Sequence, residues 1–113
     1  MRTATDFALD VDQPGQVLAL RGRLDVRVTA DVRLELAAAV DAGSGPLLLD
    51  VAALEGVDAT GLGVLVGAHR RAGRAGRAGR VLVLRDVPPA LARVLLLSRL
   101  DRVLRTTRTV VLT

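Results

Sequence analysis

The most informative part of the sequence is Val57-Asp58-Ala59-Thr60-Gly61-Leu62-Gly63-Val64-Leu65-Val66-Gly67. It follows a continuous apolar run at residues 46–51 and precedes a basic tract at residues 70–80. Asp58 and Thr60 both favour the N-cap position of a helix, because a side-chain oxygen there accepts from the free N–H groups of the first turn. The pattern therefore predicts a buried strand, a short loop and the first turns of a helix that continues to about Arg71.

The glycines of this stretch are costly in a helix. Gly61, Gly63 and Gly67 each weaken it by roughly 1 kcal/mol relative to alanine. A segment that tolerates all three is expected to need close approach by a neighbouring element, a partner or an anion. Apolar spacing predicts that the inward face of this helix consists of Leu62, Leu65, Val66 and His69.

The residues before this stretch predict a hairpin, a helix and a central strand. Alternating apolar residues indicate strands at residues 7–11 and 17–24, joined by turn residues at 13–16. A helix is predicted from Thr29, as its N-cap, to Asp41, with an apolar stripe of Val32, Leu36, Ala39 and Val40. The apolar run at residues 47–51 predicts a strand that is covered on both faces.

The residues after the stretch predict a second fully buried strand at 81–84 and a third helix that begins near Val87-Pro88-Pro89. The inward residues of that helix are predicted to be Leu91, Val94, Leu95, Leu97 and Leu100. A closing strand is expected within residues 102–113. The order β-β-α-β-α-β-α with a closing β predicts an α/β fold, in which a mixed sheet carries three to four helices.

The length and composition bound the class of protein. The 113 residues indicate one domain spanning residues 1–113, and the absence of cysteine favours a reducing compartment. The first twelve residues lack the apolar core of a signal peptide. No uncharged apolar run approaches the roughly 18 residues of a membrane span. We therefore expect a soluble cytoplasmic domain without a membrane partner.

Charge is distributed unevenly along the chain. Residues 1–69 carry five Arg and ten acidic residues, whereas residues 70–113 carry eleven Arg and two acidic residues. A basic half can serve a nucleic acid or an acidic protein surface. The repeat of Arg, Ala and Gly at residues 71–80 lacks the aromatic side chains that usually stack on bases. We interpret it as a fraying helix end and a solvated loop, and a nucleic-acid partner is the weaker alternative.

The sequence contains no visible constellation for catalysis. His69 is the only histidine, and its spacing is typical of the edge of a core. Ser44 and Ser98 have no base near them in the predicted elements. The glycines at residues 61–67 do not match a dinucleotide-binding loop, because the third falls one residue late. We therefore predict a non-enzymatic protein with no cofactor and no metal.

Several motifs together resemble the STAS domain of bacterial anti-sigma factor antagonists, over nearly the whole length of the chain. They lie at residues 22–25, 47–51, 58–63, 79–84 and 95–104. The Asp-x-Thr-Gly-Leu-Gly loop at residues 58–63, which enters a helix, is the most specific of these motifs. The fold of that family agrees with the element order predicted above.

The resemblance implies a protein-binding switch. Such antagonists bind an anti-sigma factor, often a Ser/Thr kinase, and thereby release a sigma factor for transcription. By this resemblance the partner-binding loop comprises Asp25, Asp58, Ala59, Thr60, Gly61, Leu62 and Gly63. Asp25, at the end of a neighbouring strand, is expected to lie near the other residues and to help shape the loop.

The resemblance also identifies one departure. In the family the kinase phosphorylates a serine or threonine directly after the loop aspartate, and this breaks the complex. Here Ala59 holds that position, so we expect an antagonist that is independent of phosphorylation. Thr60 is the alternative acceptor, since a helix N-terminus accommodates a phosphate well.

Two further expectations follow from the resemblance. A scaffold or lipid-transport-associated STAS domain is the alternative role. Many relatives continue into a further helix, whereas this sequence stops at Thr113. The lack of that helix would expose apolar surface or favour a homodimer.

Overall fold

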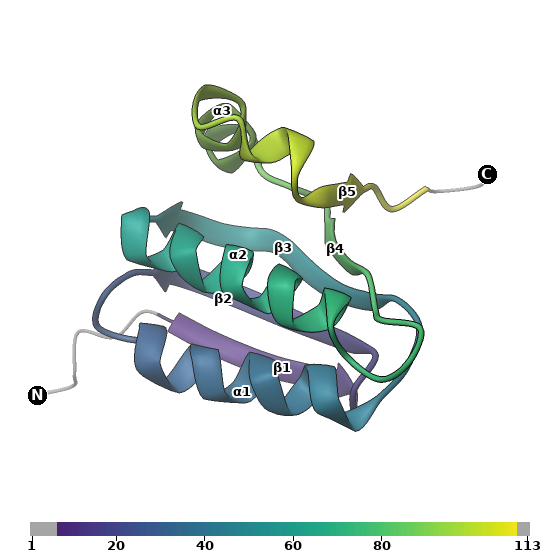
Figure 1. Cartoon of the computed structure of the whole chain (residues 1–113). Coiled ribbons are helices and arrows are strands. Elements are labelled where there is room, and N and C mark those ends of the chain that lie inside the picture. Colours follow the sequence, from purple (N-terminus) through teal and green to yellow (C-terminus); the bar gives the residue numbers. More distant parts are fainter. Residues whose placement is uncertain (1–6, 111–113) are drawn as a thin grey trace, which may run out of the picture.

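The computed structural model describes residues 7–110, which form five strands, three α-helices and one 3-10 helix. In chain order these are β1 Phe7–Gln13, β2 Val17–Leu24, α1 Thr29–Ala42, β3 Leu47–Val57, α2 Ala59–Gly73, β4 Leu82–Arg85, α3 Pro89–Leu97, the 3-10 helix η1 Leu100–Arg102 and β5 Arg105–Thr107. The strands form one sheet in the order β1-β2-β3-β4-β5 (Figure 1). β1 and β2 are antiparallel, and the other neighbours are parallel. The predicted mixed α/β architecture with an N-terminal hairpin is confirmed.

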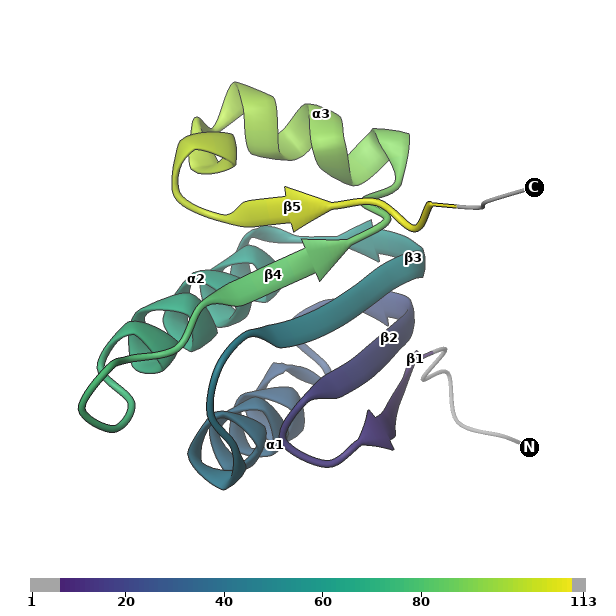
Figure 2. The same ribbon diagram turned by 90° about the vertical axis from the view of Figure 1, so that its right-hand side faces the viewer.

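Two helices cover one face of the sheet. Figure 2 shows α1 and α2 side by side behind the strands, while α3 lies at the end of the sheet where β5 is. Successive side chains of a strand alternate between its faces, and those that face α1 and α2 are mostly leucines. The strand residues that are at most 1% exposed are Leu18, Leu20, Leu24, Leu47, Leu49, Val51, Leu82 and Leu84.

The opposite face of the sheet is not covered by α1 and α2, so the prediction of strands buried on both faces is wrong. Residues 47–51 and 81–84 were expected to be buried on both faces, but burial alternates along β3 and β4. Leu47 and Leu49 are buried, whereas Leu48 is only half-buried. The reason is that α1 and α2 lie on the same side (Figure 2). On the other side Asp50 of β3 pairs with Arg85 of β4 over 3.1 Å.

The first helix begins one residue earlier than predicted. Val28, not Thr29, occupies the N-cap position of α1, and no side chain caps the helix. Thr29 is the first helical residue and is buried, with its Oγ1 donating to the Val26 carbonyl over 3.4 Å. The predicted apolar stripe is confirmed, since the buried residues of α1 include Val32, Leu36, Ala39 and Val40.

The Arg-Ala-Gly tract is only partly the solvated loop that we predicted. Arg74 and Arg77 are exposed, but Arg80 is only 5% exposed. Its guanidinium donates to the carbonyl oxygens of Ala39 over 3.0 Å and Val40 over 2.9 Å, near the C-terminal end of α1. It also donates to the carbonyl oxygens of Gly15 over 2.6 Å and Gly45 over 2.8 Å. Arg80 thus satisfies free carbonyl groups at the end of α1. It also joins its own loop to the loops that contain Gly15 and Gly45.

In the C-terminal third the predicted elements are present, but not all of the residues predicted to face inward are buried. Leu91 and Leu95 of α3 are buried, and Val94 and Leu100 are half-buried. Leu97 is 78% exposed, so its prediction as an inward residue is wrong. The closing strand is the three-residue β5. The predicted ranges also include residues 1–6 and 111–113, which lie outside the described residues.

Within residues 7–110 no helix is both long enough and apolar enough to cross a bilayer.

Candidate functional site

Asp58 organises the start of α2. Its Oδ1 accepts from the Gly61 N–H over 2.8 Å and from the Thr60 hydroxyl over 2.6 Å. These two bonds, with the Thr60 hydroxyl as the larger cause, lower the pKa of the Asp58 carboxyl from its ordinary value. Asp58 is therefore the N-cap that the sequence predicted. The alternative prediction, Thr60 as the N-cap, is wrong because Thr60 lies inside the helix and donates to the cap.

The same carboxylate holds the helix against the end of β2. Asp58 Oδ2 accepts from the Val26 N–H over 3.1 Å, and the Asp58 N–H donates to the Leu24 carbonyl over 3.2 Å. Sequence reasoning missed Val26 and Leu24, because both contribute only backbone atoms and their side chains give no signal. Residues 58–63 are here called the capping loop, although only Asp58 precedes the helix and the residues predicted as a loop form the start of α2. Hydrogen bonds of Asp58 hold this segment both to the end of β2 and to the first turn of α2.

Asp25 lies beside the capping loop, as expected. It follows β2 directly and pairs with the Arg27 guanidinium over 3.0 Å. The Arg27 side chain is the main cause that lowers the pKa of Asp25, while the nearby Asp58 carboxylate acts in the opposite direction. Asp25 therefore shapes the turn that presents Val26 to Asp58, through Arg27 rather than through a direct bond to the capping loop.

Gly61 is required by this arrangement. A Cβ atom at Gly61 would overlap the Leu24 carbonyl oxygen and would lie 2.9 Å from Cγ1 of Val57. The glycines predicted close approach by another part of the molecule. At Gly61 that part is the end of β2, which packs directly against α2. This packing brings Asp25 and the capping loop together at one edge of the fold.

A family model described as "Mlab, STAS domain" matches residues 7–108. The chain belongs to the STAS domain family. No curated protein sequence gives a significant match.

Solved structures share the fold of this STAS domain. The structure of the anti-sigma factor antagonist SpoIIAA in its unphosphorylated form is 19% identical, with a TM-score of 0.65 over 92% of this chain and 89% of that chain. An anti-sigma factor antagonist from Mycobacterium paratuberculosis is 23% identical, with a TM-score of 0.67 over 92% and 86%. An anti-sigma-factor antagonist (STAS) domain protein from Planctomyces limnophilus is 19% identical, with a TM-score of 0.72 over 94% and 92%.

The inward face of α2 in this STAS domain differs from the predicted one. The buried residues are Gly61, Val64, Leu65, Ala68 and Ala72. Of the predicted set only Leu65 is among them, and Leu62, Val66 and His69 are half-buried. The face is displaced because α2 packs against α1 and the sheet through small residues, which allow close approach. The spacing of the small residues Gly61, Ala68 and Ala72 is the sequence signal from which the inward face of α2 could have been predicted.

The outward face of α2 is lined by small residues. Ala59, Gly63 and Gly67 are exposed and follow one another at intervals of four, so they lie along one side of the helix. A Cβ atom at Gly63 or at Gly67 would meet no other atom within 4 Å. Neither glycine is therefore needed for the packing of this STAS domain, in contrast to Gly61.

Other chemistry near the capping loop is limited. Within residues 7–110 no group of three or more His, Cys, Asp or Glu side chains is arranged to hold a metal ion. Val57, next to the loop, lines a hollow of about 170 Å³ between the end of β3 and α3. The capping loop and the outward face of α2 together form an open surface, which suits contact with a macromolecule better than enclosure of a small molecule.

Proposed function

We propose that this STAS domain is an anti-sigma factor antagonist, which binds an anti-sigma factor in the cytoplasm and thereby frees a sigma factor. The contact surface is the capping loop with Asp25 and the outward face of α2. The partner is an anti-sigma factor of the Ser/Thr kinase type. The domain itself acts by binding and has no catalytic role.

The observation that carries the proposal is the unneeded glycine on the outward face of α2. Gly63 and Gly67 each cost the helix roughly 1 kcal/mol relative to alanine, and the interior of the domain gains nothing in return. A glycine on an exposed helix face permits close approach of another backbone. A partner seated against Ala59, Gly63 and Gly67 accounts for these residues.

The proposed switch is independent of phosphorylation. Ala59, the exposed residue directly after Asp58, has no hydroxyl group to accept phosphate. The Thr60 hydroxyl is already a donor to the Asp58 carboxylate over 2.6 Å, and its phosphorylation would place a second anion against that carboxylate. Control of the complex would therefore depend on abundance or on a signal to the partner.

Capture from the native lysate tests this proposal. Wild type and Asp58→Arg serve as baits, circular dichroism checks that both are folded, and mass spectrometry identifies the bound proteins. Enrichment of an anti-sigma factor by wild type alone supports the proposal. Equal capture of that factor by both baits would show that the capping loop is not the contact surface.

A scaffold or lipid-transport-associated STAS domain is the second candidate. It is favoured by Ala59, which lacks the hydroxyl group that a phosphorylation switch would need at this position. Capture of membrane-transport subunits by wild type, lost in Asp58→Arg, would favour this candidate over the first.

Nucleic-acid binding is a third candidate from a different class. Nine arginines of the basic half are exposed, but one of them, Arg71, pairs with Asp41. Arg85 pairs with Asp50, and Arg80 is buried. The tract 71–80 thus serves the fold in part. Oligonucleotide affinity that persists at physiological salt would favour this candidate, because weak nonspecific binding is lost steeply as salt rises.

A further inference from the structure

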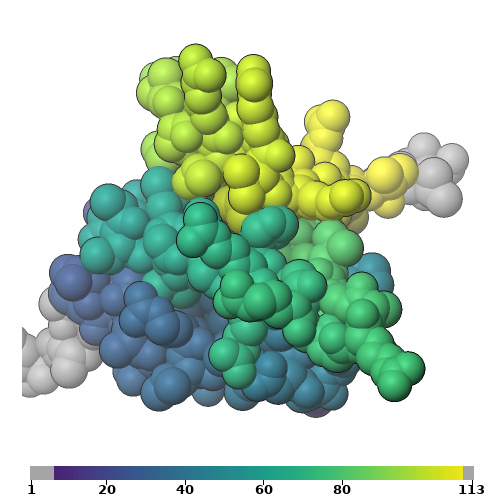
Figure 3. Space-filling model, viewed as in Figure 1, coloured from purple at the N-terminus to yellow at the C-terminus, as the bar shows by residue number. Residues whose placement is uncertain are grey.

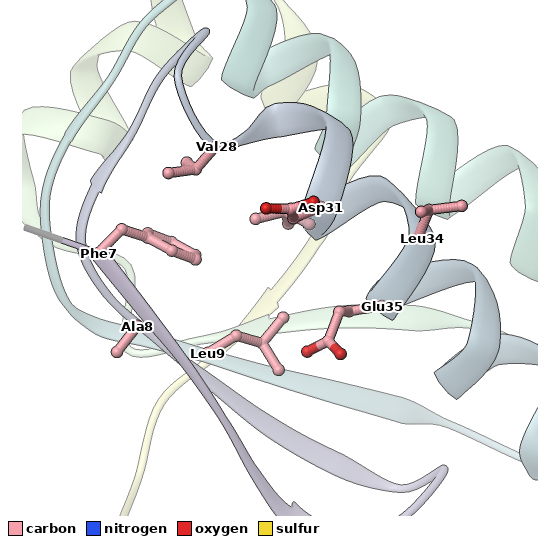
Figure 4. Close-up of a pocket in the computed structure, with 8 residues that line it drawn as sticks. Phe7, Ala8, Leu9, Val28, Asp31, Leu34 and Glu35 are labelled. Atoms are coloured by element: carbon pink, nitrogen blue, oxygen red, sulfur yellow. The ribbon is translucent and has the colours of Figure 1, made fainter. Parts of the chain in front are cut away.

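A groove with an acidic rim separates β1 from α1. It has a volume of about 490 Å³ and an apolar floor that includes Phe7, Leu9 and Val32. Figure 4 shows Phe7 and Leu9 of β1 directed toward α1, with the carboxylates of Asp31 and Glu35 on the helix side. Within residues 7–110 neither carboxylate takes part in a salt bridge. This β1–α1 groove therefore offers apolar surface and negative charge that no salt bridge from another described residue neutralises.

A ridge of opposite character lies on α3. Leu96 is 63% exposed and Leu97 is 78% exposed, although both are large apolar side chains. Arg93 is exposed and precedes them by three and four residues, so the three side chains are neighbours on the helix surface. Figure 3 shows the segment that contains α3, η1 and β5 standing out above the rest of the molecule. In the described part of the chain Arg93 forms no salt bridge, so the α3 ridge offers apolar surface and positive charge.

The two surfaces complement each other in shape and charge. The groove is concave and acidic, while the ridge is convex and basic. A symmetric contact of ridge with ridge would bring Arg93 near its own copy, and a contact of groove with groove would oppose the carboxylates of Asp31 and Glu35. Like charges in such contacts are repelled, whereas contact of ridge with groove pairs opposite charges.

The surfaces cannot meet within one molecule. The groove lies along the β1 edge of the sheet, and the ridge lies at the β5 end (Figures 1 and 2). We propose that a second copy of this chain inserts its α3 ridge into the β1–α1 groove. The contact is head-to-tail, so each copy keeps one free groove or one free ridge, and association continues beyond two copies. The capping loop is not part of either surface, and this inference does not depend on the proposed function.

Two single-surface variants test the proposal. Leu97→Asp damages the ridge and keeps the groove, while Glu35→Arg damages the groove and keeps the ridge. Both residues are exposed, so both variants are expected to fold, which circular dichroism and urea unfolding check. Arg77→Glu is the matched control, because it reverses a charge on an exposed residue outside both surfaces. Sedimentation velocity over a wide range of protein concentration measures the association.

The expected pattern is specific to a head-to-tail contact. Wild type and Arg77→Glu associate beyond dimers as concentration rises, and each single-surface variant binds itself at least about tenfold more weakly. An equimolar mixture of Leu97→Asp and Glu35→Arg forms complexes of two chains and no larger ones, since one intact ridge meets one intact groove.

Other results would overturn the proposal. A wild type that stays monomeric at the highest soluble concentration has no such contact. A closed dimer that neither variant weakens is built from other surfaces. A mixture of the two variants that remains monomeric, while wild type associates, shows that ridge and groove do not bind each other. Capture of a different apolar and basic protein in the groove, with wild type monomeric, would assign that surface to another occupant.

Discussion

The Thr60 hydroxyl donates a hydrogen bond of 2.6 Å to the Asp58 carboxylate, two residues before it in the chain. The same carboxylate accepts from the Gly61 N–H and the Val26 N–H. One acidic side chain thus caps α2 and ties it to the end of β2. The Thr60 hydroxyl is committed to that network, and the neighbouring Ala59 has no hydroxyl at all.

The Asp58 network predicts a loss of stability in acid. Its hydrogen bonds lower the pKa of Asp58 in the folded protein, so their contribution is present above the ordinary pKa of 3.8 and is lost as pH falls through the folded value. Asp58→Asn should lower the urea midpoint at pH 7. At pH 3 the difference from wild type should shrink, because below the ordinary pKa of 3.8 the unfolded wild type binds a proton at Asp58 more readily than the folded wild type does. A difference that stays constant between these pH values would show that the charge of Asp58 is irrelevant.

The glycines of α2 predict opposite responses to the same substitution. Gly61→Ala should lower the free energy of unfolding by about 2 kcal/mol, because the new Cβ overlaps the Leu24 carbonyl. Gly63→Ala should raise it by about 1 kcal/mol, because the Cβ meets open space and alanine favours the helix. Urea unfolding of both variants measures the two changes. If both substitutions destabilise the domain, the outward position of Gly63 is wrong.

Arg80 is predicted to be the most important arginine for stability. Arg80→Ala removes donors from four or more carbonyl groups that join α1 to the loops at Gly15 and Gly45. The free energy of unfolding should fall by about 3 kcal/mol, the cost of leaving buried polar groups unpaired. Arg80→Lys should also destabilise, since a point charge cannot reach the same set of carbonyls. Arg77→Ala, in the exposed part of the tract, is the control, and an equal loss there would contradict this role.

Restoring a hydroxyl at position 59 is predicted to restore control by phosphorylation. Wild type incubated with ATP and a captured kinase-type anti-sigma factor should gain no phosphate, whereas Ala59→Ser should gain one phosphate per chain. The phosphorylated variant should then release the kinase, because about two negative charges appear at the contact surface. Intact mass and native electrophoresis measure both steps. Stoichiometric phosphate on wild type would instead identify Thr60 as an acceptor.

Local sequence patterns predicted the elements and the cap. Alternating residues gave the hairpin, and the capping preference of aspartate placed the start of α2 at Asp58, since both signals are contained in a few neighbouring residues. The faces were harder to predict. Leu48 and Leu97 are the same residue type as the buried leucines, so the sequence does not separate them. Only the position of the helices around the sheet leaves Leu48 half-buried and Leu97 exposed.

Arg80 illustrates what the sequence could not predict. It ends a repeat in which Arg74, Arg77 and Arg80 each follow a glycine, and its only local difference is that a valine follows it in place of an alanine. Its burial depends on carbonyl groups at Gly15, Val40 and Gly45, which only the complete fold brings together. In the candidate site, Val26 escaped prediction for the same reason, because it contributes a backbone N–H from a distant part of the chain.

The most direct test of the proposed function is the affinity of the captured anti-sigma factor for Gly63→Arg and Gly73→Arg, measured by calorimetry. Both place the same side chain on α2 at a glycine whose Cβ meets no atom within 4 Å, but the two positions are about 15 Å apart along the helix axis. We predict that Gly63→Arg binds at least about tenfold more weakly than wild type, while Gly73→Arg binds within about twofold of it. Equal affinity of Gly63→Arg and wild type would contradict the account, because the outward face of α2 would then not be the contact surface.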